Sequence, residues 1–107
     1  MNMSIDQKEL LAKVPTQLSI GGQWRDASSG ETFDVENPAT GATIATLSSA
    51  NSDDAVAALD AACAVQDEWA RTTPRERADI LRRAFELLHE RADEFATLMT
   101  LEMGKPF

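Results

Sequence analysis

The thiol of Cys63 is the obvious nucleophile candidate in this sequence, which has one cysteine. A reactive thiolate needs a base, a positively charged neighbour or a helix N-terminus to lower the pKa of the thiol. Cys63 has Ala61-Ala62 before it and Ala64-Val65 after it, in the middle of an alanine-rich stretch with helical spacing. We therefore expect Cys63 to be a small buried core residue.

His89 is the one histidine, so a metal cluster built on several histidines is impossible. A hydrolase with a Cys–His pair would need Cys63 and His89 to meet, which two facing helices could permit. His89 is followed by Glu90 and Arg91 on the polar side of a helical stretch. An exposed or hydrogen-bonded helix histidine is the simpler expectation.

The other residue types that could do chemistry have structural explanations. The five glycines form neither G-x-G-x-x-G nor a Walker A motif, so no phosphate-binding loop is predicted. The carboxylate pairs Glu31 with Asp34 and Asp53 with Asp54 fit turns and helix caps. Trp24 and Trp69 stand singly at the ends of elements, as core anchors do. The residues alone therefore predict no catalytic, cofactor-binding or metal site.

Short β-like runs alternate with turn residues over residues 16–50. Gly21-Gly22 suits a two-residue hairpin turn, because glycine tolerates positive φ. Ser28-Ser29-Gly30 and Asn37-Pro38 are further turn sequences. We predict three or four short strands, none of them long enough to make a stable sheet by itself. Residues 1–15 precede them as a polar tail, either frayed or forming a docking turn that Pro15 ends.

Residues 51–107 have the spacing of three consecutive helices. Asn51 or Ser52 can cap the first helix, which is expected to run to about Trp69. The second begins at Thr73-Pro74-Arg75-Glu76, a capping box with proline at the first helical position. The third has Asp93 as its expected cap, and Gly104 and Pro106 mark its end. The fold class is thus α+β, with short β-hairpin strands followed by three helices.

Two of these helices carry a broad apolar face. In the second helix the apolar face is opposite a charged face with i,i+4 pairs, Asp79 with Arg83 and Arg82 with Glu86. The apolar residues at helical spacing are Ile80, Leu81, Ala84, Leu87 and Leu88 in the second helix, and Phe95, Leu98 and Met99 in the third. If nothing else packs on this chain, these faces stay partly uncovered, which is typical of an interface.

Composition and charge narrow the class of protein. With 43% hydrophobic and 26% charged residues the chain is not compositionally disordered, and 107 residues make one domain at most. The net charge of −8 argues against nucleic-acid and anionic-membrane partners, which both require a basic surface. No signal peptide and no stretch of roughly 20 apolar residues is evident. One cysteine fits a reducing compartment, so a cytoplasmic location is expected.

Together these motifs resemble the N-terminal region of aldehyde dehydrogenases, over about residues 16–107. Within the family, "MTLEMGKP" is most similar to the succinate-semialdehyde dehydrogenase branch. The residues that carry the resemblance are Gly22, Trp24, the run Asn37-Pro38-Ala39-Thr40-Gly41, Trp69, Arg77, Leu81 and residues 102–106, Glu-Met-Gly-Lys-Pro.

The resemblance implies that the chain is an incomplete part of an α/β enzyme, a fragment of its cofactor domain. Family members oxidise an aldehyde to a carboxylate with NAD or NADP, using a cysteine in a Gly-Gln-x-Cys context and a glutamate in a Glu-Leu-Gly-Gly context. Neither string occurs here, so Cys63 is not the family nucleophile. The resemblance therefore implies a chain without catalytic or cofactor-binding residues of its own. Its partner would be the remainder of the aldehyde dehydrogenase fold, in a full-length enzyme expected to be a homo-oligomer.

A second hypothesis is a free-standing, non-catalytic helical interaction module that uses the same apolar faces. The end of the chain bears on this choice, because Gly104 and Pro106 stop a helix and Phe107 then follows. In the family resembled, this helix end leads on into further elements. We therefore expect the activity to reside in segments outside these residues.

Overall fold

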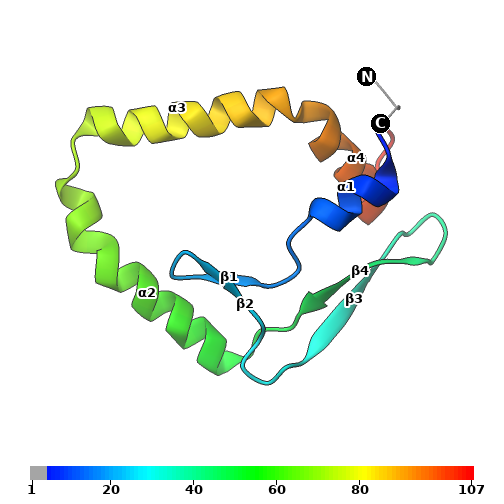
Figure 1. The fold of residues 1–107 in the computed structure, drawn as a ribbon, viewed down its shortest axis with the longest axis horizontal. Coiled ribbons are helices and arrows are strands. Elements are labelled where there is room, and N and C mark those ends of the chain that lie inside the picture. The colour runs from blue at the N-terminus through cyan, green and yellow to red at the C-terminus, as the bar shows by residue number, and fades with distance from the viewer. Residues whose placement is uncertain (1–4) are drawn as a thin grey trace.

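Two small β-hairpins and four helices make up the fold in the computed structural model, which describes residues 5–107 (Figure 1). The elements follow in the order α1 (Gln7–Lys13), β1 (Leu18–Ile20), β2 (Gln23–Arg25), β3 (Thr32–Glu36), β4 (Thr43–Ser48), α2 (Ser52–Arg71), α3 (Pro74–Glu90) and α4 (Ala92–Met103). The expected sequence of hairpin strands and then three helices is confirmed. A short helix precedes them where a frayed tail or docking turn was predicted.

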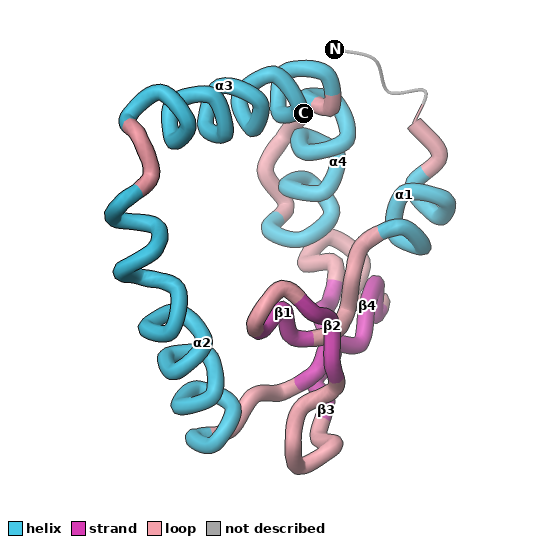
Figure 2. Tube along the Cα trace, turned by 60° about the vertical axis from the view of Figure 1, so that its left-hand side comes forward, coloured by secondary structure: helices cyan, strands magenta, loops and turns pink. Residues whose placement is uncertain are grey.

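Helix α1 forms because its first turn is capped and its apolar side is covered. The side chain of Asp6 accepts a hydrogen bond from the N–H of Glu9 at 3.1 Å. Leu10 is buried, and α1 lies against α4 (Figure 2). The helix ends before Pro15. Residues 1–4 of the expected tail lie outside the described residues.

The β-strands form two separate antiparallel pairs. Strands β1 and β2 pair across the turn at Gly21-Gly22, which confirms the predicted hairpin. Strands β3 and β4 pair with a register shift between Val35 and Glu36. One backbone hydrogen bond, from the N–H of Ser48 to the carbonyl oxygen of Thr16, joins β4 to the segment before β1. Another, from the N–H of Ser49 to the carbonyl oxygen of Glu31, extends the pairing beyond the open end of this second hairpin.

Most of the helix boundaries follow from local chemistry. Asn51 caps α2 and Thr73 caps α3, each in a complete capping box with the acidic residue three positions later. Helix α2 continues two residues beyond Trp69. The prediction of Asp93 as a cap is wrong: α4 starts at Ala92, without a side-chain cap, directly after Arg91 ends α3. Asp93 instead occupies the first turn, where an acid also favours the helix.

Gly104 ends α4 in the left-handed conformation, with φ of 75°, as predicted. A Cβ atom at this position would lie 3.2 Å from Cγ of Pro38, in the loop between β3 and β4. The Asn-Pro and Gly-Lys-Pro motifs therefore meet in space. The left-handed backbone favours glycine here, and the close approach to Pro38 adds crowding for any residue with a Cβ atom.

We expect Gly104→Ala to destabilise the chain by roughly 1–2 kcal/mol from backbone strain alone, with a further loss from crowding against Pro38. Gly30→Ala is the matched control, because Gly30 has φ of 74° and no atom within 4 Å of the added Cβ. Urea unfolding of the complete protein, followed by circular dichroism, measures the loss in each variant. Equal losses in the two variants would show that the contact with Pro38 is immaterial.

Residues 5–107 have almost no core. Its radius of gyration is 17.1 Å, whereas a compact domain of this length has about 13 Å. Among the described residues the buried apolar side chains are Leu10, Ala27 and Leu101. Helices α2 and α3 extend as two arms, and neither has another helix packed along its length (Figures 1 and 2). Most of the apolar surface of these arms is consequently exposed.

Candidate functional site

An exposed apolar face on α3 is the most extensive feature that could have a function. Its members recur at helical spacing and are 40–70% exposed; we call Ile80, Leu81, Phe85, Leu87 and Leu88 the α3 face. This confirms the expectation that the face stays uncovered within these residues. The exposed surface of the chain is 8115 Å², against roughly 5,900 Å² for a compact monomer of this mass. The excess is more than twice the roughly 800 Å² that each partner buries in a standard protein interface.

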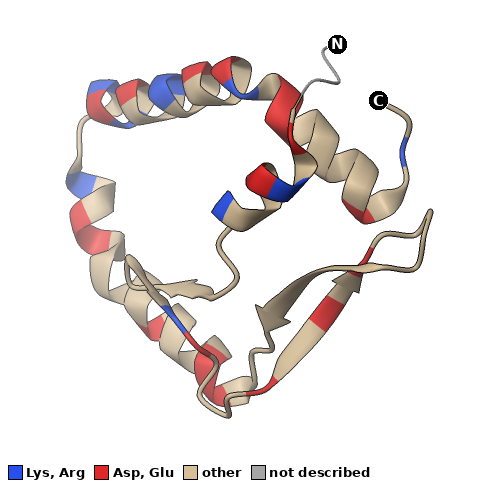
Figure 3. Ribbon diagram, turned by 45° about the vertical axis from the view of Figure 1, so that its right-hand side comes forward, with Lys and Arg blue, Asp and Glu red and all other residues tan. Residues whose placement is uncertain are grey.

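The polar side of α3, by contrast, satisfies its own charges. Arg82 pairs with Glu86, as predicted, at 3.4 Å, and Arg83 reaches both Glu86 and Glu90. Asp79 pairs with Arg75 at 4.0 Å in place of the expected Arg83. Positively and negatively charged residues are interspersed along this helix (Figure 3). The charged side of α3 thus makes ion pairs within the helix, whereas the apolar α3 face has no packing partner among the described residues.

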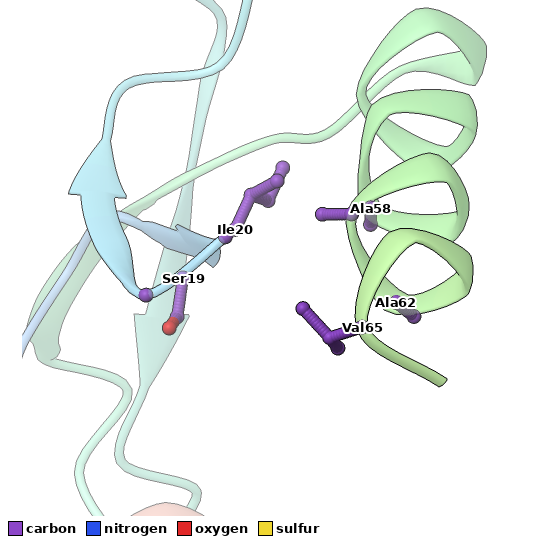
Figure 4. Close-up of a pocket in the computed structure, with 8 residues that line it drawn as sticks. Ser19, Ile20, Ala58, Ala62 and Val65 are labelled. Carbon is purple, nitrogen blue, oxygen red and sulfur yellow. The ribbon is translucent and has the colours of Figure 1, made fainter. Parts of the chain in front are cut away.

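A shallow groove lies between the β1–β2 hairpin and α2 (Figure 4). One wall is the hairpin turn, and the other is a row of small residues on α2. Its lining residues are Ser19, Ile20, Gly21, Gly22, Ala58, Ala61, Ala62 and Val65. None of these residues is charged, and the hydroxyl of Ser19 is the one polar side-chain group. The groove therefore suits apolar side chains and not a charged ligand.

The hairpin is held to α2 by the carboxylate of Asp54, which is 1% exposed. It accepts hydrogen bonds from the N–H of Ser28 at 3.1 and 3.2 Å and from the N–H of Asn51 at 3.1 Å. Nη2 of Arg25, in β2, lies 3.1 Å from the same carboxylate. We call these four residues the Asp54 latch. It fixes the angle at which the hairpin meets the helix and so shapes the groove.

The electrostatics of the latch favour the ionised carboxylate. The hydrogen bond from the N–H of Asn51 lowers the pKa of Asp54 below its ordinary value of 3.8, against the opposing effect of burial. The N–H of Ser28 and the positive charge of Arg25 lower this pKa further. Elsewhere, the 2.6 Å ion pair with Arg91 lowers the pKa of Glu94. Both shifts have structural causes, which are chiefly backbone hydrogen bonds for Asp54 and the hydrogen bond with Arg91 for Glu94.

Arg77, one of the residues that carried the family resemblance, acts on the end of the preceding helix. Its Nη1 donates to the carbonyl oxygens of Thr72, at 3.2 Å, and Ala70, at 3.5 Å. Carbonyls at a helix C-terminus have no partner within the helix, and a cationic side chain there also favours the helix dipole. Arg77 therefore stabilises the corner between α2 and α3.

The structure does not assemble a reactive site around Cys63. Cys63 is exposed, so its expected burial is wrong within this chain. Its side of α2 is apolar as expected, but no other element covers it. Helices α2 and α3 diverge from their corner, so Cys63 and His89 lie on separate arms (Figure 1). His89 instead stacks edge-on against Phe85, with ring centroids 4.4 Å apart.

The prediction that the two tryptophans are core anchors is also wrong within this chain. Trp24 is 56% and Trp69 46% exposed. Residues 5–107 contain no cluster of three or more metal-ligating side chains, and no helix among them is long and apolar enough to cross a bilayer. What these residues offer is thus an incompletely covered surface, made of the α3 face and the groove.

Comparison with known proteins identifies relatives of this chain. The model of the aldehyde dehydrogenase family matches residues 24–107. A succinate-semialdehyde dehydrogenase of Paenarthrobacter nicotinovorans is 70% identical over 63 residues, which cover 59% of this chain and 14% of the relative. The succinate-semialdehyde dehydrogenase (NADP+) of Escherichia coli K12 is 46% identical over 90 residues, which cover 84% of this chain and 19% of the relative.

Solved structures share the fold. An NADP-dependent enzyme of E. coli superposes with a TM-score of 0.83 at 45% identity, over 85% of this chain and 19% of the other. Betaine aldehyde dehydrogenase of Staphylococcus aureus, solved with NAD+, gives 0.86 at 31% identity, over 92% of this chain and 20% of the other. The chain thus spans about a fifth or less of the length of these relatives. It belongs to the aldehyde dehydrogenase family, and it forms a part of that family's fold.

Proposed function

We propose that this chain is the N-terminal portion of an NAD(P)-dependent aldehyde dehydrogenase that oxidises succinate semialdehyde to succinate. In this proposal the chain supplies no catalytic residue. Its role is structural: the α3 face and the groove pack against the remainder of the enzyme. The observation that carries the proposal is the large uncovered apolar surface on a chain that spans about a fifth of its relatives.

The described residues do not fit a nicotinamide dinucleotide. A pyrophosphate favours free N–H groups at a helix N-terminus. The N-termini of α2 and α3 are filled by their own capping boxes, which place the carboxylates of Asp54 and Glu76 there. Helix α4 carries Asp93 and Glu94 in its first turn. We therefore assign the cofactor to the remainder of the enzyme, and derive no step of the reaction from these residues.

The substrate in the proposal follows from the names of the two curated relatives. At 70% identity over 63 residues, the shared stretch favours the same branch of the family. We further propose that the complete enzyme is a cytoplasmic homo-oligomer. Light scattering on the complete protein measures its molar mass and so its oligomeric state.

The test is an activity assay on two proteins: the 107-residue chain and the product of the complete reading frame. With succinate semialdehyde and either NAD or NADP, we expect reduced nicotinamide from the complete protein only. Turnover by the 107-residue chain would overturn the structural role. A complete protein that oxidises other aldehydes but not this one would overturn the substrate.

The same sample decides between a part of an enzyme and a free-standing interaction module. Size exclusion and thermal unfolding of the 107-residue chain should show association or a non-cooperative transition, because it has almost no core. A compact monomer that melts cooperatively would favour the interaction module.

A further inference from the structure

We draw no further inference here: the strongest candidate, the groove between the β1–β2 hairpin and helix α2, belongs to the apolar surface already assigned to packing against the rest of the enzyme, and nothing in the structure shows what else would cover it.

Discussion

Replacing Asp54 with alanine is expected to lower the thermal midpoint of the complete protein and to loosen the β1–β2 hairpin. The carboxylate accepts from two backbone N–H groups and faces Arg25 at 3.1 Å. Both hydrogen bonds are part-buried, and losing the charged acceptor of such a bond is destabilising by about 1–3 kcal/mol. Alanine removes the acceptor of both amides at once. The E. coli relative, of which the 90 matched residues are 19%, is more than four times as long as this chain, so each kcal/mol shifts the midpoint of the complete protein by only about 1 °C. The expected fall is therefore roughly 2–6 °C, measured by differential scanning calorimetry.

Asp53→Ala is the matched control for this prediction. Asp53 also lies in the first turn of α2 and carries the same charge, but it is exposed and stands outside the latch. We expect its midpoint to stay close to that of the parent protein, since an exposed charge near a helix N-terminus contributes only about 0.3–1 kcal/mol. Hydrogen exchange adds a local readout: only Asp54→Ala should speed exchange at Ser28. Equal effects of the two variants would contradict a latch.

The pH dependence of stability should depend on the same carboxylate. The pKa of Asp54 is lowered in the folded state, so its contribution is complete above the ordinary value of 3.8. It is lost as the pH falls through the lower, folded-state pKa. Asp54→Asn cannot ionise, so the stability difference between the parent and this variant should be constant near neutral pH and shrink below about pH 4. Urea unfolding of the complete parent protein and of the complete Asp54→Asn variant, at a series of pH values, measures this difference in the free energy of unfolding. A constant difference down to pH 2 would show that the charge of Asp54 is not involved.

Local chemistry made much of the fold predictable. The capping box at Thr73 and Glu76 and the glycine stop at Gly104 each lie within a few residues of sequence, so their geometry follows from residue type and spacing. The Asp54 latch could be predicted from the sequence only in part. Asn51 and Asp54 are visible as a cap, but Arg25 and Ser28 are more than twenty residues away, and nothing in their spacing shows that they converge.

The errors in the prediction have two other physical causes. Helical spacing showed which side of α2 is apolar, but it cannot show whether another element covers that side. Burial was therefore expected for Cys63, and it is exposed. Trp24 and Trp69 were expected to be core anchors from their places at element ends, which likewise do not show what covers them, and both are exposed. Asp93 was expected as a cap because an acid often begins a helix, but Arg91 both ends α3 and precedes α4. A lone cap signal does not distinguish the cap from the first turn that follows it.

Leu81→Gln is expected to have opposite consequences in the short chain and in the complete enzyme. Leu81 is the most exposed member of the α3 face, at 70%. In the 107-residue chain the substitution replaces apolar surface that water already reaches, and glutamine is a good helix former. The far-ultraviolet circular dichroism should therefore stay the same. Self-association, measured by sedimentation, should weaken.

In the complete enzyme the same substitution would bury a polar amide where the α3 face packs on the remainder of the fold. Losing the burial of a leucine and burying an unpaired amide together are destabilising by about 3–5 kcal/mol. We expect a large fall in thermal midpoint and in soluble, active protein. Asp79→Gln is the matched control, since it introduces the same residue two positions away on the charged side, where Asp79 is 73% exposed. The Asp79→Gln variant should match the parent in the self-association of the short chain and in the thermal midpoint and activity of the complete enzyme.

The pair of variants separates an intramolecular role of the α3 face from a role as a docking surface for another protein. If the face is covered by the rest of the same chain, Leu81→Gln must destabilise the complete enzyme even when it is purified alone. If the face stays open in the complete protein, Leu81→Gln and Asp79→Gln will have the same midpoint and the same specific activity. That second result would contradict the packing role proposed for this segment, because an apolar face that remains exposed has no folding energy to lose.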